Sequence, residues 1–297
     1  MTAAPRETDL ALPRRSRRNE APDSTGDAGF LGWVWPSYRS RPVERWKDHV
    51  VTPQEDWLAE EVPVVLVYNG QSHVVMLATP LDLEDFALGF SLTEGIVGSS
   101  REILSIRVHH RSEGIEVRMR IAPERQAALA GRERNLTGRT GCGLCGTASL
   151  RQALRHPGRV QADIRISAED MHQALSDLRG RQELNRLTGA VHAAAWAVPG
   201  PGVVSVREDI GRHNALDKLV GLLAKTGVGH DDGYVLVTSR ASYEMVQKCA
   251  AAGIGLMVAI SAPTGLAVRL AEETGVTLVG FARGNSHVVY AHPWRLA

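Results

Sequence analysis

The chain has 297 residues, of which 43% are hydrophobic and 23% are charged, and its formal net charge is +1. These values are ordinary for a globular protein with a sizeable core, and the length suggests two domains. A net charge near zero gives no argument for a nucleic-acid or membrane partner, and no apolar run reaches the length of a transmembrane helix. The three cysteines disfavour a disulfide scaffold and favour a reducing, cytoplasmic location.

The first 48 residues predict an N-terminal tail without regular structure. They are rich in arginine, proline, aspartate and serine and show no hydrophobic periodicity, so they bury too little apolar surface to fold. The cluster Arg14–Arg18 resembles a twin-arginine export signal, but a polar stretch, residues 19–24, follows where such a signal has an apolar segment. We therefore interpret residues 1–48 as disordered.

Residues 49–134 predict a small α+β domain. Two strand-like runs, 64–68 and 72–78, flank Asn69-Gly70, the dipeptide most typical of a type I′ hairpin turn. The first of these runs is rich in valine, which suits a pleated, half-buried surface.

A helix is expected over residues 81–94, because apolar side chains recur there on one helical face. A second hairpin pairs 103–110 with 115–121 around the turn residues Ser112–Gly114. A further helix is expected after it, so the order in this domain is hairpin, helix, hairpin, helix.

Residues 135–158 predict a glycine-rich loop followed by a short helix, and they carry two of the three cysteines, Cys142 and Cys145. A cysteine just before a helix N-terminus feels the positive end of the helix dipole, which lowers the thiol pKa and raises the thiolate fraction. Several arginines close in sequence act in the same direction. The loop therefore predicts a reactive thiolate.

Taken alone, the Cys-x-x-Cys pair leaves three other interpretations open: half of a zinc site, a thioredoxin-type redox pair, or a buried structural turn. A closed zinc site needs four ligands, and the sequence has no second Cys-x-x-Cys or Cys-x-x-His pair. A thioredoxin pair belongs in a βαβ unit, and no clear strand lies beside the loop. The third cysteine, Cys249, lies within a helical pattern and predicts a small buried side chain.

Residues 159–297 predict an α/β/α sandwich, because continuous apolar strands alternate there with amphipathic helices. Ser167–Asp170 is typical of the start of a helix, expected over 168–179. The further elements, in chain order, are strands 190–198 and 203–206, helix 212–226, strand 234–238, helix 241–252, strand 256–260, helix 264–274, strand 276–281 and an extended segment, 286–291.

Polar segments follow several of these strands, at the edge where open α/β sheets bind ligands. Three of them, 207–214, 238–242 and 261–265, offer hydroxyls, arginines or free amides at helix starts. Helix capping alone would account for Ser239 and Thr264. The stretch after the last buried strand, 281–286, adds an aromatic ring, a cation and a flexible turn, although by itself it could also be an ordinary hairpin loop. Together these segments predict a site for a phosphate-bearing ligand at this edge.

The order of these elements resembles the cytidine deaminase fold, in which His-x-Glu at one helix start and Pro-Cys-x-x-Cys at the next build a zinc site. At the corresponding starts this chain has His213-Asn-Ala215 and Ser239-Arg-Ala-Ser242. The glutamate is missing and serine replaces both thiols, so the groups that would hold zinc and activate water are lost. We therefore expect the fold without a metal site.

Taken together, the motifs of residues 60–297 resemble the formate dehydrogenase accessory sulfurtransferase family, FdhD. The similarity leaves out the N-terminal tail, and its many ordered motifs make it specific. The motifs that carry it are Tyr68-Asn-Gly70, Met76–Ile96, Cys142-Gly-Leu-Cys-Gly146, Thr188–Ala195, Glu208–Lys218, Ser239–Val246 and Tyr290–Pro293.

The resemblance implies a sulfur carrier that receives sulfur from a cysteine desulfurase as a persulfide on Cys142, with Cys145 as a helper that relays or resolves it. The acceptor would be the molybdenum (or tungsten) of a bis(molybdopterin guanine dinucleotide) cofactor, bound as substrate before its insertion into formate dehydrogenase. No intrinsic metal is expected. The family's cofactor-binding stretch corresponds to Phe281, Ala282, Arg283, Gly284, Asn285 and Ser286.

Two other functions stay open at this point. A chaperone could hold the cofactor while the cysteines are merely structural, and a deaminase-like hydrolase would need stoichiometric zinc. Thr140-Gly141 precedes Cys142 where many relatives have serines, and Arg283 is the single charge in its stretch. A homodimer is expected from the commonness of two-fold dimers.

Overall fold

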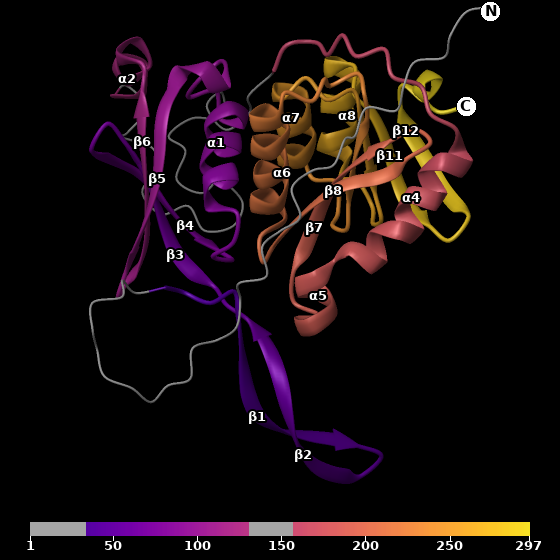
Figure 1. Ribbon diagram of the computed structural model, residues 1–297. Helices are drawn as coiled ribbons and strands as arrows, with labels where there is room; N and C mark the ends of the chain where they lie inside the picture. Colours follow the sequence, from indigo (N-terminus) through magenta and orange to yellow (C-terminus); the bar gives the residue numbers. More distant parts are fainter. Residues whose placement is uncertain (1–33, 131–156) are drawn as a thin grey trace, which may run out of the picture. The chain divides into compact units, whose positions relative to one another are not determined.

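The computed structural model describes residues 34–130 and 157–297 (Figure 1). In this part of the chain the strands form three sheets: a two-stranded ribbon, a four-stranded sheet and a six-stranded sheet. None of the helices described there is long and apolar enough to cross a membrane.

The first sheet is an antiparallel ribbon of β1 (Tyr38–Lys47) and β2 (Val50–Ala59). Asp48 and His49 form the turn between them, and both have positive φ, as a type I′ turn requires. The prediction of a disordered tail is therefore wrong for residues 38–48. Nearly every side chain of the ribbon is exposed, so no buried face imposes the alternation by which a strand is recognised in sequence.

The second sheet has the order β4-β3-β6-β5, with β3 and β6 parallel. The predicted hairpins and helices of this module are confirmed, and Asn69 and Gly70 have the positive φ of the predicted turn. Phe86 and Phe90 join its core cluster. The elements are β3 (Val62–Tyr68), β4 (Gln71–Ala78), α1 (Leu83–Thr93), the 3-10 helix η1 (Ser100–Glu102), β5 (Ile103–Arg111), β6 (Gly114–Ile121) and α2 (Pro123–Ala130).

The third sheet has the order β12-β11-β10-β9-β7-β8, in which β9, β10 and β11 are parallel. The predicted strands and helices after residue 165 are present within a few residues, and the sequence missed α5. The elements are α4 (Ala168–Arg181), α5 (Glu183–Thr188), β7 (His192–Val198), β8 (Gly202–Asp209), α6 (Arg212–Thr226), β9 (Tyr234–Val237), α7 (Tyr243–Ala251), β10 (Leu256–Ala259), α8 (Gly265–Thr274), β11 (Thr277–Arg283), β12 (Ser286–Ala291) and the 3-10 helix η3 (Pro293–Arg295).

Helices lie on both faces of the third sheet (Figure 1), and alternate side chains of its strands belong to two different cores. Trp196, Val235 and Met257 belong to the core shared with α6, α7 and α8. Leu236 and Val258, the next residues in their strands, belong instead to the core shared with α4. Burial on both faces explains the continuous apolar runs, and it confirms the predicted α/β class and its three layers.

Helix α1 of the second sheet packs against α6 because two glycines allow the backbones to touch. A Cβ atom on Gly89 would overlap the backbone carbonyl of Asp217, and one on Gly221 would overlap the carbonyl of Asp85. No residue with a side chain fits at such a distance. The two larger sheets are thus held together through direct contact between the backbones of two helices.

Gly89→Ala is expected to lower the free energy of unfolding by about 1–3 kcal/mol, because the added methyl group has no space against the Asp217 carbonyl. Gly180→Ala in α4 is the matched control, since no atom lies within 4 Å of its added Cβ. Alanine's helix propensity should stabilise that variant by up to about 1 kcal/mol. Urea unfolding measures both variants, and equal stabilities would contradict the close helix contact.

Candidate functional site

Two of the predicted site residues, Cys142 and Cys145, lie outside the described residues. The described chain stops at Ala130, the end of α2, and resumes at Pro157. Cys145 is twelve residues before Pro157, and an extended chain spans at most about 40 Å over that length. A surface that exchanges sulfur with this thiol must therefore lie within about 40 Å of Pro157.

The predicted cofactor-binding stretch, residues 281–286, spans the end of β11, the two turn residues Gly284 and Asn285, and the first residue of β12. Phe281 has a φ of 51°, and the pairing with β12 shifts between Gly280 and Arg283, so the strand bulges before it turns. Gly284 follows with a φ of 58°, which glycine adopts without strain. A bulky residue at positive φ is strained, and such strain is concentrated at binding sites.

Parallel pairing brings this turn beside the polar ends of two other strands. Because β9, β10 and β11 run in one direction, their carboxyl ends share an edge of the sheet. The amide of Phe281 donates to the Ser261 carbonyl over 3.2 Å, and the amide of Thr264 donates to the Ala241 carbonyl over 3.0 Å. The segments predicted from these three strand ends are therefore neighbours.

A cavity of about 640 Å³ lies between the β11–β12 turn and helix α4, within the size range of small-molecule sites. Four of the six predicted residues line it, namely Ala282, Arg283, Gly284 and Asn285. Phe281 and Ser286 are exposed but are not among its lining residues. The structure therefore gathers most of the predicted stretch around one cavity. The wall opposite is formed by His172, Gln173, Ser176 and Arg179 of α4.

Positive charge prevails on the wall of this cavity. Arg179 and Arg283 are fixed cations, and Glu169 is the one carboxylate among the described residues that line it. Two histidines, His172 on α4 and His287 on β12, lie side by side there, with His172 Nε2 3.1 Å from His287 Nδ1. Guanidinium groups are the preferred partners of phosphate oxygens, so the wall suits an anionic ligand.

No sequence pattern predicts the histidine pair. Its members are separated by 115 positions, and each is a single histidine in an otherwise ordinary helix or strand. Burial and the neighbouring His172 lower the pKa of His287, while His172 Nδ1 is buried and has no hydrogen-bond partner among the described residues. Only the packing of α4 across β12 brings the two rings together.

The segment 207–214, predicted to bind an anion, instead joins the α+β module to the α/β/α domain. Arg207 donates to Asp85 of α1 over 2.6 Å, and Asn214 donates to the carbonyl of Leu77 over 2.9 Å. These two side chains are engaged within the chain, which corrects the prediction for them. The polar groups serve as contacts between modules because their strand end faces α1 and β4.

The helix starts that correspond to a deaminase zinc site are occupied differently. His213 Nε2 lies 2.8 Å from a Glu244 carboxylate oxygen, and the Ser239 hydroxyl donates to the Arg240 carbonyl over 3.0 Å. Thr264 caps α8 by accepting from the amide of Ala267, as predicted. Within residues 34–130 and 157–297, no group of three His, Cys, Asp or Glu side chains could hold a metal ion.

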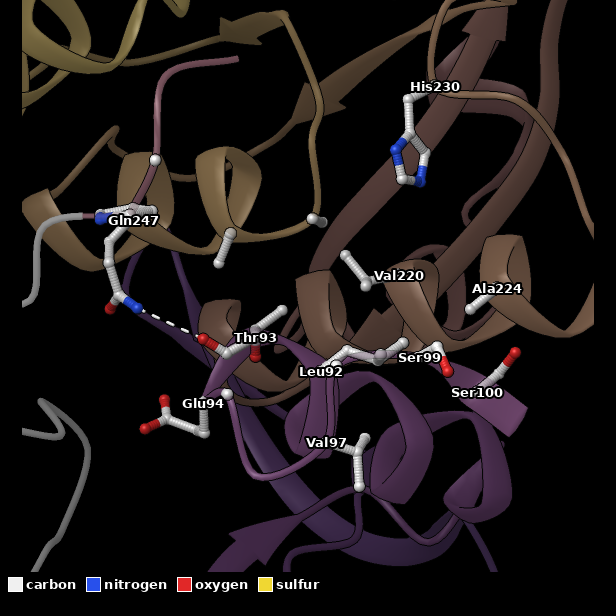
Figure 2. Close-up of a pocket in the computed structure, with 16 residues that line it drawn as sticks. Leu92, Thr93, Glu94, Val97, Ser99, Ser100, Val220, Ala224, His230 and Gln247 are labelled. Carbon is white, nitrogen blue, oxygen red and sulfur yellow. Dashed lines mark hydrogen bonds between the residues drawn. The ribbon is translucent and has the colours of Figure 1, made fainter. Parts of the chain in front are cut away.

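A second cavity, of about 610 Å³, lies where α1 ends beside α6 and α7 (Figure 2). The Gln247 side chain donates to the Thr93 carbonyl over 3.3 Å at its wall, and His230 lies on the opposite side in this view. Pro157 and Gly158, the first described residues after the cysteine segment, also line it. The chain therefore emerges from the cysteine segment at the wall of this cavity.

Cys249 is fully buried in the core between the third sheet and α6–α8, as the sequence predicted. Burial raises the pKa of its thiol to about 12. A thiol with such a pKa carries almost no thiolate at neutral pH, and the thiolate is the nucleophile in sulfur exchange. Cys249 is therefore unsuited to carry sulfur.

Comparison with known proteins agrees on one family. The model of the FdhD/NarQ family matches residues 59–297. The sulfur carrier protein FdhD of Cupriavidus necator is 55% identical over 261 residues, which cover 88% of this chain and 91% of the relative. The sulfur carrier protein FdhD of Xanthomonas euvesicatoria is 50% identical, with 89% and 94% covered.

A solved structure shows the same fold. A protein from Desulfotalea psychrophila, provisionally named a formate dehydrogenase accessory protein, superposes with a TM-score of 0.69 and covers 88% of this chain and 100% of its own. Its sequence identity is 21%, so the similarity concerns the fold. The mixed α/β architecture is thus shared with a crystallised protein.

In a Cys142→Ala/Cys145→Ala double variant, we expect the one remaining thiol to resist iodoacetamide at about pH 8. With a pKa of about 12, Cys249 is about one ten-thousandth thiolate at that pH. Mass spectrometry of the native protein should show no added group, whereas the same protein in urea should be alkylated. Alkylation of the native double variant at the rate seen in urea would contradict the burial of this thiol.

Proposed function

This chain belongs to the FdhD/NarQ family, and on that premise we propose that it is a sulfur carrier in the maturation of formate dehydrogenase. The observation that carries the proposal is 55% identity, over nearly nine-tenths of the chain, to a protein named a sulfur carrier. The matched region includes both Cys142 and Cys145 and the stretch 281–286.

We propose that the carried sulfur is a persulfide on Cys142. Its thiolate attacks the outer sulfur of a persulfide on a cysteine desulfurase, the S–S bond of the donor breaks, and the donor cysteine leaves as a thiolate. Cys142 keeps the transferred sulfur, and the exchange is redox-neutral. The glycines around Cys142 and the helix that the sequence predicts after it favour a reactive thiolate, and a cytoplasmic location would keep the thiols reduced.

Release of this sulfur as sulfide takes two electrons, which the second cysteine would provide. The Cys145 thiolate attacks the inner sulfur of the persulfide and displaces hydrosulfide, and a disulfide between Cys142 and Cys145 forms. A dithiol reductant then reduces the disulfide and restores both thiols. This step would explain why the two cysteines lie only three positions apart, since a disulfide must form between them.

The sulfur acceptor is proposed to be the metal of a bis(molybdopterin guanine dinucleotide) cofactor, which is cargo for formate dehydrogenase. The cavity between α4 and the β11–β12 turn supports this assignment, because Arg179 and Arg283 line it and suit the diphosphate of a guanine dinucleotide. Asn285, on the same wall, offers both a donor and an acceptor for a base edge.

Two structural proposals accompany this function. The order of helices and strands in residues 159–297 supports a cytidine deaminase fold for that domain. A homodimer stays a prediction from the commonness of two-fold assemblies.

Cys142→Ala is expected to abolish sulfur transfer from a desulfurase supplied with radiolabelled cysteine. Wild type should retain the label on the peptide that contains Cys142 and lose it after treatment with a thiol reductant. Cys249→Ala is the matched control, because that buried thiol carries almost no thiolate. Full maturation of formate dehydrogenase by Cys142→Ala would leave a chaperone that holds the cofactor and would end the sulfur-carrier proposal.

Arg283→Ala is expected to weaken binding of diguanosine diphosphate, in which two guanosines are joined through a diphosphate. Loss of one exposed charged contact corresponds to about 1 kcal/mol, or roughly a fivefold increase in Kd. Arg269→Ala removes the same charge from the exposed surface of α8, outside the cavity, and should leave the Kd unchanged. Equal effects of the two substitutions, measured by calorimetry, would place the dinucleotide elsewhere.

A further inference from the structure

The two histidines of the cavity form a hydrogen bond that leaves one ring nitrogen without a partner. His172 and His287 have ring centroids 5.2 Å apart and planes inclined by 51°, with His172 Nε2 3.1 Å from His287 Nδ1. The contact is therefore an N–H···N hydrogen bond between ring edges, in which one ring donates and the other accepts. A neutral pair holds a single proton in this bond.

His172 Nδ1, the nitrogen on the other side of that ring, is buried and has no partner among the described residues. Whichever tautomer is present, a buried donor or acceptor is left unsatisfied, which costs about 1–3 kcal/mol. Buried polar atoms are nearly always paired, so an unpaired ring nitrogen beside a cavity calls for a partner such as a water, an ion or a ligand. Both histidines line the cavity, so an atom of a bound molecule is within their reach.

The charged groups around the pair come from both elements that form the cavity. Helix α4 contributes Glu169, one turn before His172, and Arg179, about two turns after it; the β11–β12 turn contributes Arg283. Ile260 of the neighbouring strand end is apolar. Burial and the neighbouring His172 lower the pKa of His287, so the pair resists a positive charge while no anion is bound. An anion bound in the cavity would instead favour a positive charge on the histidine pair.

We propose that His172 and His287 form a proton-linked anion contact, which takes up one proton when the diphosphate of a dinucleotide enters the cavity. The proposal rests on the proposed function, because it assigns the ligand as the guanine dinucleotide part of the cofactor. One proton passes from solvent to the imidazole pair, and no other bond forms or breaks. The protonated pair then offers N–H donors to phosphate oxygens and compensates their charge.

A direction of pH dependence follows from this proton uptake. The bound anion raises the pKa of the pair above its value in the empty protein, so the bound state holds more protons than the free state. Affinity must then increase as the pH falls through the interval between the two pKa values. The limit for one proton is a tenfold change in Kd per pH unit, which follows from linkage and amounts to about 1.4 kcal/mol.

The test uses the full chain and diguanosine diphosphate between about pH 6 and pH 8, where histidine titrates. Each phosphate of this probe has one ester bond and one anhydride bond, so it has no second ionisation in this range, unlike a terminal phosphate with its pKa near 6. Calorimetry in two buffers of different ionisation enthalpy counts the protons taken up on binding. We expect wild type to bind more tightly at the lower pH and to take up close to one proton per molecule.

His172→Gln and His287→Gln should each remove the proton uptake and reduce affinity at low pH to the wild-type value at high pH. His109→Gln, on β5 and outside the cavity, is the matched control and should titrate like wild type. Glu169→Gln should keep the pH dependence; its loss in that variant would assign the titration to the carboxylate and overturn the proposal.

The outcomes also separate this inference from the proposed cofactor site. Wild type that binds the dinucleotide with the same Kd at both pH values, without proton uptake, would overturn the histidine proposal and leave the cavity as a cofactor site. Wild type that does not bind the dinucleotide at all would overturn both.

Discussion

Two buried lysine–carboxylate clusters hold the α+β module against the α/β/α domain, and the second of them shares residues with the wall of the second cavity. In the first, Lys218 and Asp209 are fully buried and 2.7 Å apart. Thr79, from the other module, completes the cluster: its carbonyl accepts from Lys218 and its amide donates to Asp209. Removing one member would leave an uncompensated buried charge, which costs about 3–5 kcal/mol. The buried ion pair of the α/β/α domain therefore depends on hydrogen bonds with Thr79 of the α+β module.

The second cluster lies at the C-terminal end of α1. Lys248 of α7 donates to both carboxylate oxygens of Asp217, and Thr93 of α1 donates to the same carboxylate. Burial alone would lower the pKa of Lys248, but Asp217 and Glu94 raise it above its usual value, so the ammonium stays charged. Together with the glycine contact between α1 and α6, these clusters fix how the two modules are positioned against each other. Thr93 and Glu94 are also wall residues of the second cavity, so the shape of that cavity depends on the relative position of the two modules.

Much of the fold could be predicted from the sequence because local rules determine it. The Asn69-Gly70 turn, the Ser167 cap and the apolar strands of the third sheet each follow from the residues at that place. The exposed ribbon β1–β2 was missed because no face of it is buried. The role of Arg207 was missed because its partner, Asp85, is 122 positions away in the sequence. The histidine pair was missed for the same reason, since a contact between distant elements leaves no periodic pattern.

The buried cysteine, Cys249, shows which surroundings are unsuitable for the reactive thiol of a sulfur carrier. Cys249 shows what enclosure does to a thiol here: burial raises its pKa to about 12, and sulfur exchange needs an attacking thiol with a pKa near the ambient pH. Burial is tolerated by the two lysine–carboxylate clusters, because each charge there keeps the same partner. A carrier must exchange sulfur with two partners in turn, so its thiol belongs on a segment joined to the rigid body at both ends. The proposed carriers, Cys142 and Cys145, precede Pro157 by fifteen and twelve positions in the sequence, and Pro157 lies at the wall of the second cavity.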